Sequence, residues 1–208
     1  GVGLGALARR EGSVERQVRR GTTQGEKSKT RELSAIDEVA RRLAADLPEQ
    51  KGVVIAHGDY RFGNCLVDTD EGKITGVLDW ELCTLGDPLA DLGYLGVYWS
   101  DPGEPQSRPN DPTGIEGFPT YDELLARYEQ RTGRDLSNIN YYRAFSAWRL
   151  AVISEGVYAR FLKGAMGNQD LDQSVLDGFK SGTEMLATEA LERLDTDRSI
   201  NDNRKTTS

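Results

Sequence analysis

The pattern of apolar residues predicts one amphipathic helix in the first quarter of the chain. Ser34 and Asp37 form a capping pair at its start, and Pro48 stops it. Its apolar side chains recur at helical spacing: Ile36, Val39, Ala40, Leu43 and Leu47.

Three short runs rich in β-branched and apolar residues predict strands over 53–56, 65–67 and 74–78. Residues 68–72, between the last two runs, are polar and end in glycine, which is typical of a hairpin turn. We therefore expect a small β region in the centre of the chain.

Helical patterns resume after this β region. Asp87 and Pro88 have the residue types of an N-cap and a first helical position. After a loop over 101–119, Thr120 and Glu123 form a capping box that opens a helix ending near residue 133. Two longer helices are predicted over 139–162 and 171–194.

These elements predict an α/β fold that is mainly helical. At 208 residues, the chain is long enough to bury a sizeable core. We expect a peripheral, Arg- and Gly-rich segment over 1–30, a main body over 31–195 and a disordered polar tail over 196–208.

Charge and composition narrow the class of protein. The net charge of -8 disfavours nucleic-acid binding, and no apolar run approaches the length of a membrane helix. Cys65 and Cys83 are too few for a disulfide framework, and the start of the chain lacks the features of a signal peptide. We therefore expect a cytoplasmic protein that binds no nucleic acid and no membrane.

A cluster of basic residues lies near the start of this acidic chain. It is typical of a solvated helix face, although it would also suit an anionic substrate. Its members are Arg9, Arg10, Arg16, Arg19 and Arg20.

Polar residues with chemical potential gather where the predicted strands end. Asp59 follows the first strand within a glycine-containing loop, Asn64 comes five residues later, and Asp79 ends the hairpin. Three oxygen-bearing side chains can converge there. Phosphoryl transfer needs such a set, because its catalysis depends on metal-ion clamping and on positioning the attacking hydroxyl. Hard oxygen ligands suit Mg²⁺.

The spacing from His57 to Asp59 and Asn64 resembles the kinase catalytic loop. The Gly58-Asp59 variant is similar to the aminoglycoside phosphotransferase and choline kinase group. Later segments, such as 141–143 and 155–158, resemble the branch of phosphotransferase domains found with acyl-CoA dehydrogenases. The resemblance implies a protein-kinase-like C-terminal lobe that transfers the γ-phosphate of ATP to the hydroxyl of a small molecule.

The same resemblance implies residue roles. Asp59 would accept the substrate hydroxyl proton, while Asn64 and Asp79 would hold Mg²⁺. Arg61 stands where protein kinases usually carry a lysine that contacts the transferred phosphate, and His57 resembles an orienting residue.

Three other acidic residues are assigned supporting roles. Asp91 would brace the catalytic loop from a helix, and Asp87 would cap that helix. Glu81 is either an outer partner of the metal or a surface residue.

We expect the chain to lack the N-terminal β lobe that grips ATP in this family, because about 50 residues with no hairpin series precede the loop. The face left uncovered would then favour self-association. The sequence does not identify the acceptor: aminoglycoside is only the label of the family, the branch found with acyl-CoA dehydrogenases favours a hydroxyacyl compound, and the Arg-rich start favours an anionic one. Two other functions stay open, namely a non-catalytic kinase-like fragment and a metal-dependent phosphoester hydrolase.

Overall fold

The protein is mainly helical with two small antiparallel sheets, in agreement with the predicted content of helices and strands. The computed structural model describes residues 12–103, 112–164 and 172–206. Among these residues, no helix is both long and apolar enough to cross a membrane. The described chain forms two compact units. The first contains residues 50–142, and the second contains residues 12–49 together with residues from 143 onwards.

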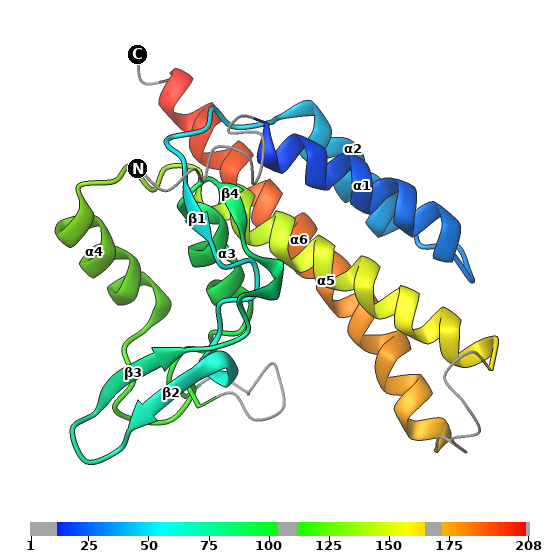
Figure 1. Ribbon diagram of the computed structural model, residues 1–208. Coiled ribbons are helices and arrows are strands. Elements are labelled where there is room, and N and C mark those ends of the chain that lie inside the picture. Colours follow the sequence, from blue (N-terminus) through cyan, green and yellow to red (C-terminus); the bar gives the residue numbers. More distant parts are fainter. Residues whose placement is uncertain (1–11, 104–111, 165–171, 207–208) are drawn as a thin grey trace, which may run out of the picture. The chain divides into compact units, whose positions relative to one another are not determined.

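Two antiparallel pairs of strands form the β part of the first unit (Figure 1). β1 (Val54–Ala56) pairs with β4 (Thr84–Gly86), and β2 (Cys65–Asp68) pairs with β3 (Lys73–Val77). The predicted hairpin is therefore confirmed. The strand β4 was not predicted, because three residues give too short a pattern to recognise.

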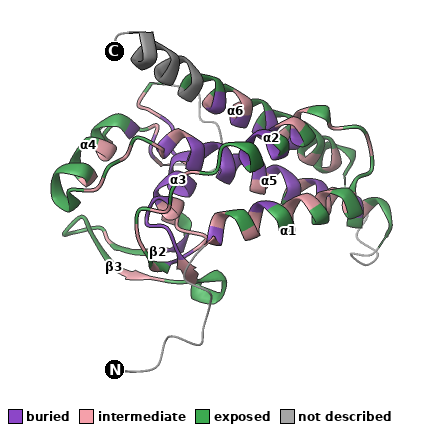
Figure 2. Cartoon of the chain, turned by 90° about the horizontal axis from the view of Figure 1, so that it is seen from above, coloured by how far each residue is buried: buried purple, intermediate pink, exposed green. Residues whose placement is uncertain are grey.

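Helices lie between and after the strands of the first unit. η2 (Phe62–Asn64) precedes β2, and η3 (Trp80–Leu82) follows β3. α3 (Leu89–Val97) is almost wholly buried, as Figure 2 shows, and α4 (Tyr121–Thr132) begins at the predicted capping box of Thr120 and Glu123.

Close packing in the first unit depends on Gly93 in α3. A Cβ atom at this position would lie 2.6 Å from the backbone carbonyl carbon of Tyr142. Because this neighbour is backbone, it cannot rotate away. The glycine therefore allows α3 to approach the start of α5 (Ile139–Leu162).

The second unit is a set of helices packed side by side (Figure 1). It contains α1 (Ser13–Ser28), α2 (Ser34–Ala45), α6 (Gln173–Thr206) and the larger part of α5 (Ile139–Leu162). Its core is apolar and includes a fully buried indole. Its buried members include Val39, Leu43, Phe145, Trp148, Ala151 and Ala190.

Ion pairs join the helices of this unit. The guanidinium of Arg42 lies 2.8 Å from the carboxylate of Asp195, which connects α2 with α6. The hydroxyl of Thr30 donates a 2.5 Å hydrogen bond to Glu155 of α5, a carboxylate that Arg31 also approaches to 3.5 Å. The buried carboxylate of Glu155 is thereby provided with partners.

The ends of the chain differ from the expectation. Residues 13–28, expected in a peripheral segment, form α1, and its Val18 is buried. The apolar face was overlooked because arginines surround it. α6 continues to Thr206 through the predicted tail, since the polar residues there include good helix formers and no proline. Residues 1–11, part of the loop 101–119, and Leu171 lie outside the described residues.

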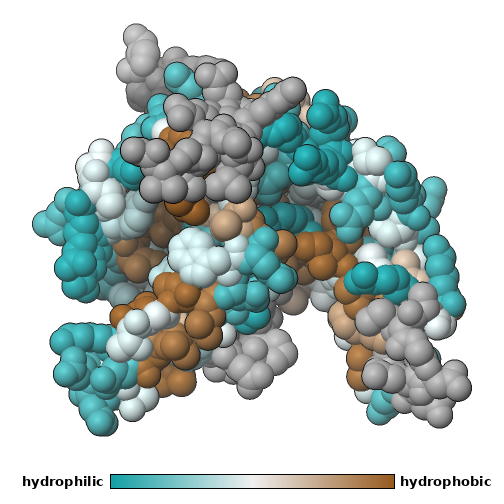
Figure 3. Space-filling model, viewed as in Figure 1, coloured by the Kyte–Doolittle hydropathy of each residue, from teal (hydrophilic) through white to brown (hydrophobic). Residues whose placement is uncertain are grey.

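The hairpin of β2 and β3 presents apolar side chains to solvent. Figure 3 shows hydrophobic surface gathered over these strands. Leu66, Val67, Ile74 and Leu78 are each about half exposed. The expected self-association stays a prediction.

Candidate functional site: the loop after β1

The imidazole of His57 is buried and uses both ring nitrogens within the loop. Its Nδ1 accepts a 3.2 Å hydrogen bond from the backbone N–H of Asp59, so its Nε2 carries the proton and donates to the carbonyl of Leu78 at 2.7 Å. The ring thus ties the loop to the end of β3. With both nitrogens engaged, it is placed to orient the loop rather than to take up a substrate proton.

Asp91 holds the same loop from α3. Its Oδ2 accepts a 2.6 Å hydrogen bond from the backbone N–H of His57, and its Oδ1 accepts a 2.8 Å bond from that of Gly58. Gly58 has φ of 85°, and a Cβ there would lie 2.8 Å from the carbonyl oxygen of Leu82. The loop can therefore adopt this path only with glycine at position 58.

Asp87 is buried and organises the start of α3. Its two carboxylate oxygens accept hydrogen bonds from the backbone N–H groups of Lys51, at 2.8 Å, and Leu89, at 2.9 Å. Asp87 also bonds the hydroxyl of Tyr142. Its carboxylate thus accepts from the first residue of α3, although the helix begins at Leu89, one residue later than predicted.

Asp59 and Asn64 are in direct contact. The side-chain amide of Asn64 donates to the backbone oxygen of Asp59 at 2.8 Å and to its Oδ2 at 2.9 Å. Asn64 is buried in η2, while the Asp59 side chain retains 18% exposure. One carboxylate oxygen is thus fixed by Asn64, while the side chain remains accessible to solvent.

Arg61 approaches Asp59 without forming a tight pair. Its Nε lies 3.7 Å from Oδ1 of Asp59, and its guanidinium lies over the ring of Tyr98 with 5.6 Å to the centroid. This places a cation beside the carboxylate.

Tyr94 is a neighbour of Asp59 that the sequence reasoning missed. Burial, helped by Tyr98 and a hydrogen bond to Asp59, raises the pKa of the Tyr94 phenol well above its usual range. The phenol therefore keeps its proton. The signal available in the sequence was its position three residues after Asp91, which places it on the same face of α3.

The register of the hairpin brings Asn64 and Asp79 to the same end. The backbone N–H of Leu78 donates to the carbonyl of Asn64 at 2.8 Å, and Asp79 is the next residue. Asp79 is exposed and adopts a left-handed conformation with φ of 66°. Its carboxylate therefore leaves the hairpin at the level of Asn64.

These donors fit a magnesium ion. Both N–H bonds of the Asn64 amide go to Asp59, which leaves Oδ1 of Asn64 as an acceptor, and the exposed carboxylate of Asp79 belongs to the same end of the hairpin. Mg²⁺ commonly takes one or two protein ligands and completes its octahedron with water and phosphate oxygens. Within the described chain, no group of three or more His, Cys, Asp or Glu residues could hold a metal.

Glu81 is exposed in η3. In the described part of the chain, no hydrogen bond or ion pair joins its carboxylate to the loop. The structure therefore does not bring Glu81 into the contacts made by His57, Asp59, Arg61 and Asn64.

The spacing of His57, Asp59 and Asn64 in this loop is that of the kinase catalytic loop. The sequence profile of the phosphotransferase enzyme family matches residues 2–142, and the chain belongs to this family.

Similar proteins come from animals and bacteria. The chain is 34% identical over 200 residues to acyl-CoA dehydrogenase family member 10 of Mus musculus, and this alignment covers 86% of the chain and 19% of that protein. It is 35% identical over 164 residues to acyl-CoA dehydrogenase family member 11 of the same species, and this second alignment covers 76% of the chain and 21% of that protein.

A solved structure is also similar. The crystal structure of a candidate aminoglycoside phosphotransferase from Ralstonia eutropha has a TM-score of 0.74 and 32% identity, covering 91% of this chain and 59% of that one. By contrast, the chain spans only about a fifth of the length of the two acyl-CoA dehydrogenase family members.

Proposed function

We propose that this chain carries the catalytic loop of a kinase-like phosphotransferase, which transfers the γ-phosphate of ATP to the hydroxyl of a small molecule. The contact between Asn64 and Asp59 carries this proposal. It fixes one oxygen of the proposed base and leaves the amide oxygen of Asn64 for a cation. The first unit would then correspond to the catalytic part of a protein-kinase-like C-terminal lobe.

In the proposed reaction, the acceptor hydroxyl oxygen forms a bond to the γ-phosphorus of ATP. The bond from this phosphorus to the bridging oxygen breaks, so ADP leaves. Asp59 takes the hydroxyl proton, and Arg61 neutralises charge on the transferred group. Asn64 and Asp79 would hold Mg²⁺, which supplies charge neutralisation for the phosphate oxygens.

The supporting residues would act through position. His57 and Asp91 fix the backbone on either side of Gly58, so Asp59 enters the site with a defined orientation. Tyr94 offers a neutral phenol that hydrogen bonds to Asp59. Such pre-organisation lowers the barrier because the groups need not reorient during the reaction.

Calorimetric titration of the chain with Mg-ATP tests the proposal. We expect binding that is lost in Asp79→Ala and kept in Asp70→Ala, which removes a carboxylate from the exposed turn of the same hairpin. Asp59→Asn should bind Mg-ATP but transfer phosphate 10²- to 10⁴-fold more slowly, roughly the range for a general base. A folded chain that binds no Mg-ATP would contradict the proposal.

A non-catalytic binding fragment is the second candidate. It is favoured by one observation, which is that the chain covers 59% of the solved relative. This candidate predicts a folded chain that neither binds Mg-ATP nor turns it over, so the same titration separates the two.

The acceptor is proposed from the relatives. Proteins named acyl-CoA dehydrogenases favour a hydroxyacyl compound, whereas the solved structure favours an aminoglycoside. A screen of hydroxyacyl-CoA thioesters against aminoglycosides, read as ADP release, decides between them. Turnover of aminoglycosides alone would contradict the hydroxyacyl hypothesis.

A further inference from the structure

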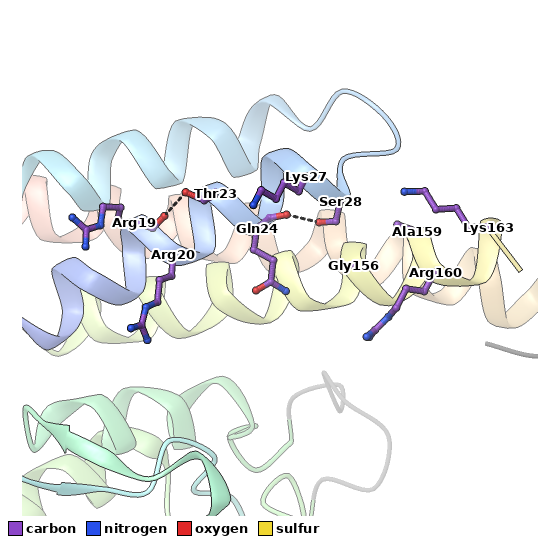
Figure 4. Close-up of a pocket in the computed structure, with 10 residues that line it drawn as sticks. All are labelled: Arg19, Arg20, Thr23, Gln24, Lys27, Ser28, Gly156, Ala159, Arg160 and Lys163. Carbon is purple, nitrogen blue, oxygen red and sulfur yellow. Dashed lines mark hydrogen bonds between the residues drawn. The ribbon is translucent and has the colours of Figure 1, made fainter. Parts of the chain in front are cut away.

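A groove between α1 and α5, within the second unit, gathers positive charge. Its volume is about 580 Å³, and five of its ten lining residues are Arg or Lys while none is acidic. The cations come from both helices (Figure 4): Arg19, Arg20, Lys27, Arg160 and Lys163.

These five cations, here called the groove cations, have no carboxylate partner among the described residues. Other basic side chains of the same unit do have one: Lys29 pairs with Asp37, Arg41 with Glu38 and Arg42 with Asp195. Like charges held close together repel one another, and an anion in the groove would relieve that repulsion. The charge pattern therefore favours an anionic occupant.

The floor of the groove is small and uncharged. Gly156 and Ala159 of α5 line it. The hydroxyls of Thr23 and Ser28 donate to backbone carbonyls of α1, at 3.1 and 2.8 Å, so they present oxygen rather than hydrogen to the groove (Figure 4). Binding of an anion therefore depends on the groove cations, and an uncharged part of a ligand can lie over the floor.

The groove cations form two separated groups. α1 and α5 run in the same direction, because Gly21 packs against Trp148 and Gly156 faces Ser28. Arg20 is thus near the level of Trp148, whereas Arg160 lies 12 residues further along α5. At 1.5 Å per residue, this is roughly 18 Å between backbone levels, a distance that the exposed arginine side chains can shorten by reorienting toward a ligand. A single phosphate is too small to engage both groups.

We propose that this groove binds a small organic molecule that carries at least two separated phosphate groups, of the nucleoside bisphosphate type. One phosphate would lie against Arg19 and Arg20, and the other against Arg160 and Lys163, with Lys27 between them. Arginine suits such a role because its planar donors match phosphate oxygens. The inference does not rest on the proposed phosphotransferase function, because every lining residue belongs to the second unit.

Calorimetric titration of the whole chain with adenosine 3′,5′-bisphosphate tests the inference. AMP and adenosine serve as matched ligands with one phosphate and none. We expect the bisphosphate to bind at least tenfold more tightly than AMP, and adenosine not to bind. Equal affinity for AMP and the bisphosphate would overturn the inference, as would binding only to duplex DNA or to phosphatidylserine vesicles.

A pair of variants assigns the binding to the groove. Arg20→Gln with Arg160→Gln removes one cation from each group, while Arg41→Gln with Lys180→Gln removes the same charge elsewhere in the unit. All four side chains are exposed, so both variants should fold, which circular dichroism checks. We expect at least tenfold weaker binding for the first variant and less than a twofold change for the second. Equal losses, or no loss in the first variant, would overturn the inference.

Discussion

The brace that Asp91 provides to the catalytic loop can be tested with a substitution that keeps the size of the side chain. In Asp91→Asn, one amide oxygen can still accept a hydrogen bond, but the NH₂ group then faces the second backbone donor. Charge-assisted bonds contribute about 1.5–3 kcal/mol each. The wild-type bonds, at 2.6 and 2.8 Å, come from His57 and Gly58. Loss of one bond and weakening of the other should cost about 2–3 kcal/mol.

Hydrogen exchange of these two amides measures the cost where it arises. Since each 1.4 kcal/mol is a factor of ten, the backbone N–H groups of His57 and Gly58 should exchange roughly 30- to 140-fold faster in Asp91→Asn. Asp122→Asn is the matched control, because Asp122 lies in the first turn of α4 and is exposed. Loss of its negative charge near the N-terminus of the helix should lower the free energy of unfolding by only about 0.3–1 kcal/mol. The reasoning is refuted if the two variants show the same exchange at these amides.

Three further outcomes follow from packing and burial. Gly93→Ala should destabilise the chain by about 1–3 kcal/mol, because the added methyl group would lie 2.6 Å from the backbone of Tyr142. Gly178→Ala meets open space and should stabilise α6 by up to about 1 kcal/mol. Equal free energies of unfolding for the two variants in urea denaturation would contradict this. Burial raises the pKa of the Cys65 thiol, so iodoacetamide should label it more slowly than the exposed Cys83, and equal rates would argue against it. Burial also raises the pKa of Tyr94 in the folded chain. Above about pH 10, the usual tyrosine pKa, the unfolded chain ionises Tyr94 while the folded chain keeps it protonated. The contribution of Tyr94 to stability is therefore present below about pH 10 and is lost as the pH rises above it. Tyr94→Phe should flatten this decline in pH-dependent unfolding, and an unchanged slope would count against the argument.

Long, periodic elements could be predicted from the sequence. The predicted helix over 139–162 has the bounds of α5, and the capping box of Thr120 has the predicted geometry. The strand β4 and the extent of α1 could not be predicted. β4 is three residues long, and α1 hides a single buried valine, Val18, among charged and polar positions.

The residues of the loop were easier to recognise in the sequence than one of their neighbours, Tyr94. The spacing of His57, Asp59 and Asn64 identifies the loop, and the structure brings these three residues into hydrogen-bonded contact. The contribution of Tyr94 depends on how α3 packs against the loop. That contact links residues 35 positions apart, which local patterns do not encode.

The left-handed backbone of Asp79 lowers the stability of the chain, while its carboxylate is needed for the proposed reaction. A non-glycine residue in the left-handed region costs about 1–2 kcal/mol, and Asp79 is the only such residue in the described chain. Glycine would remove this strain but also the carboxylate that the proposed reaction requires. A library of variants selected for thermal stability alone should therefore enrich glycine at position 79, while selection for turnover should restore the acid. The residue enriched at position 79 in each selection would show whether stability or turnover determines the sequence of the hairpin.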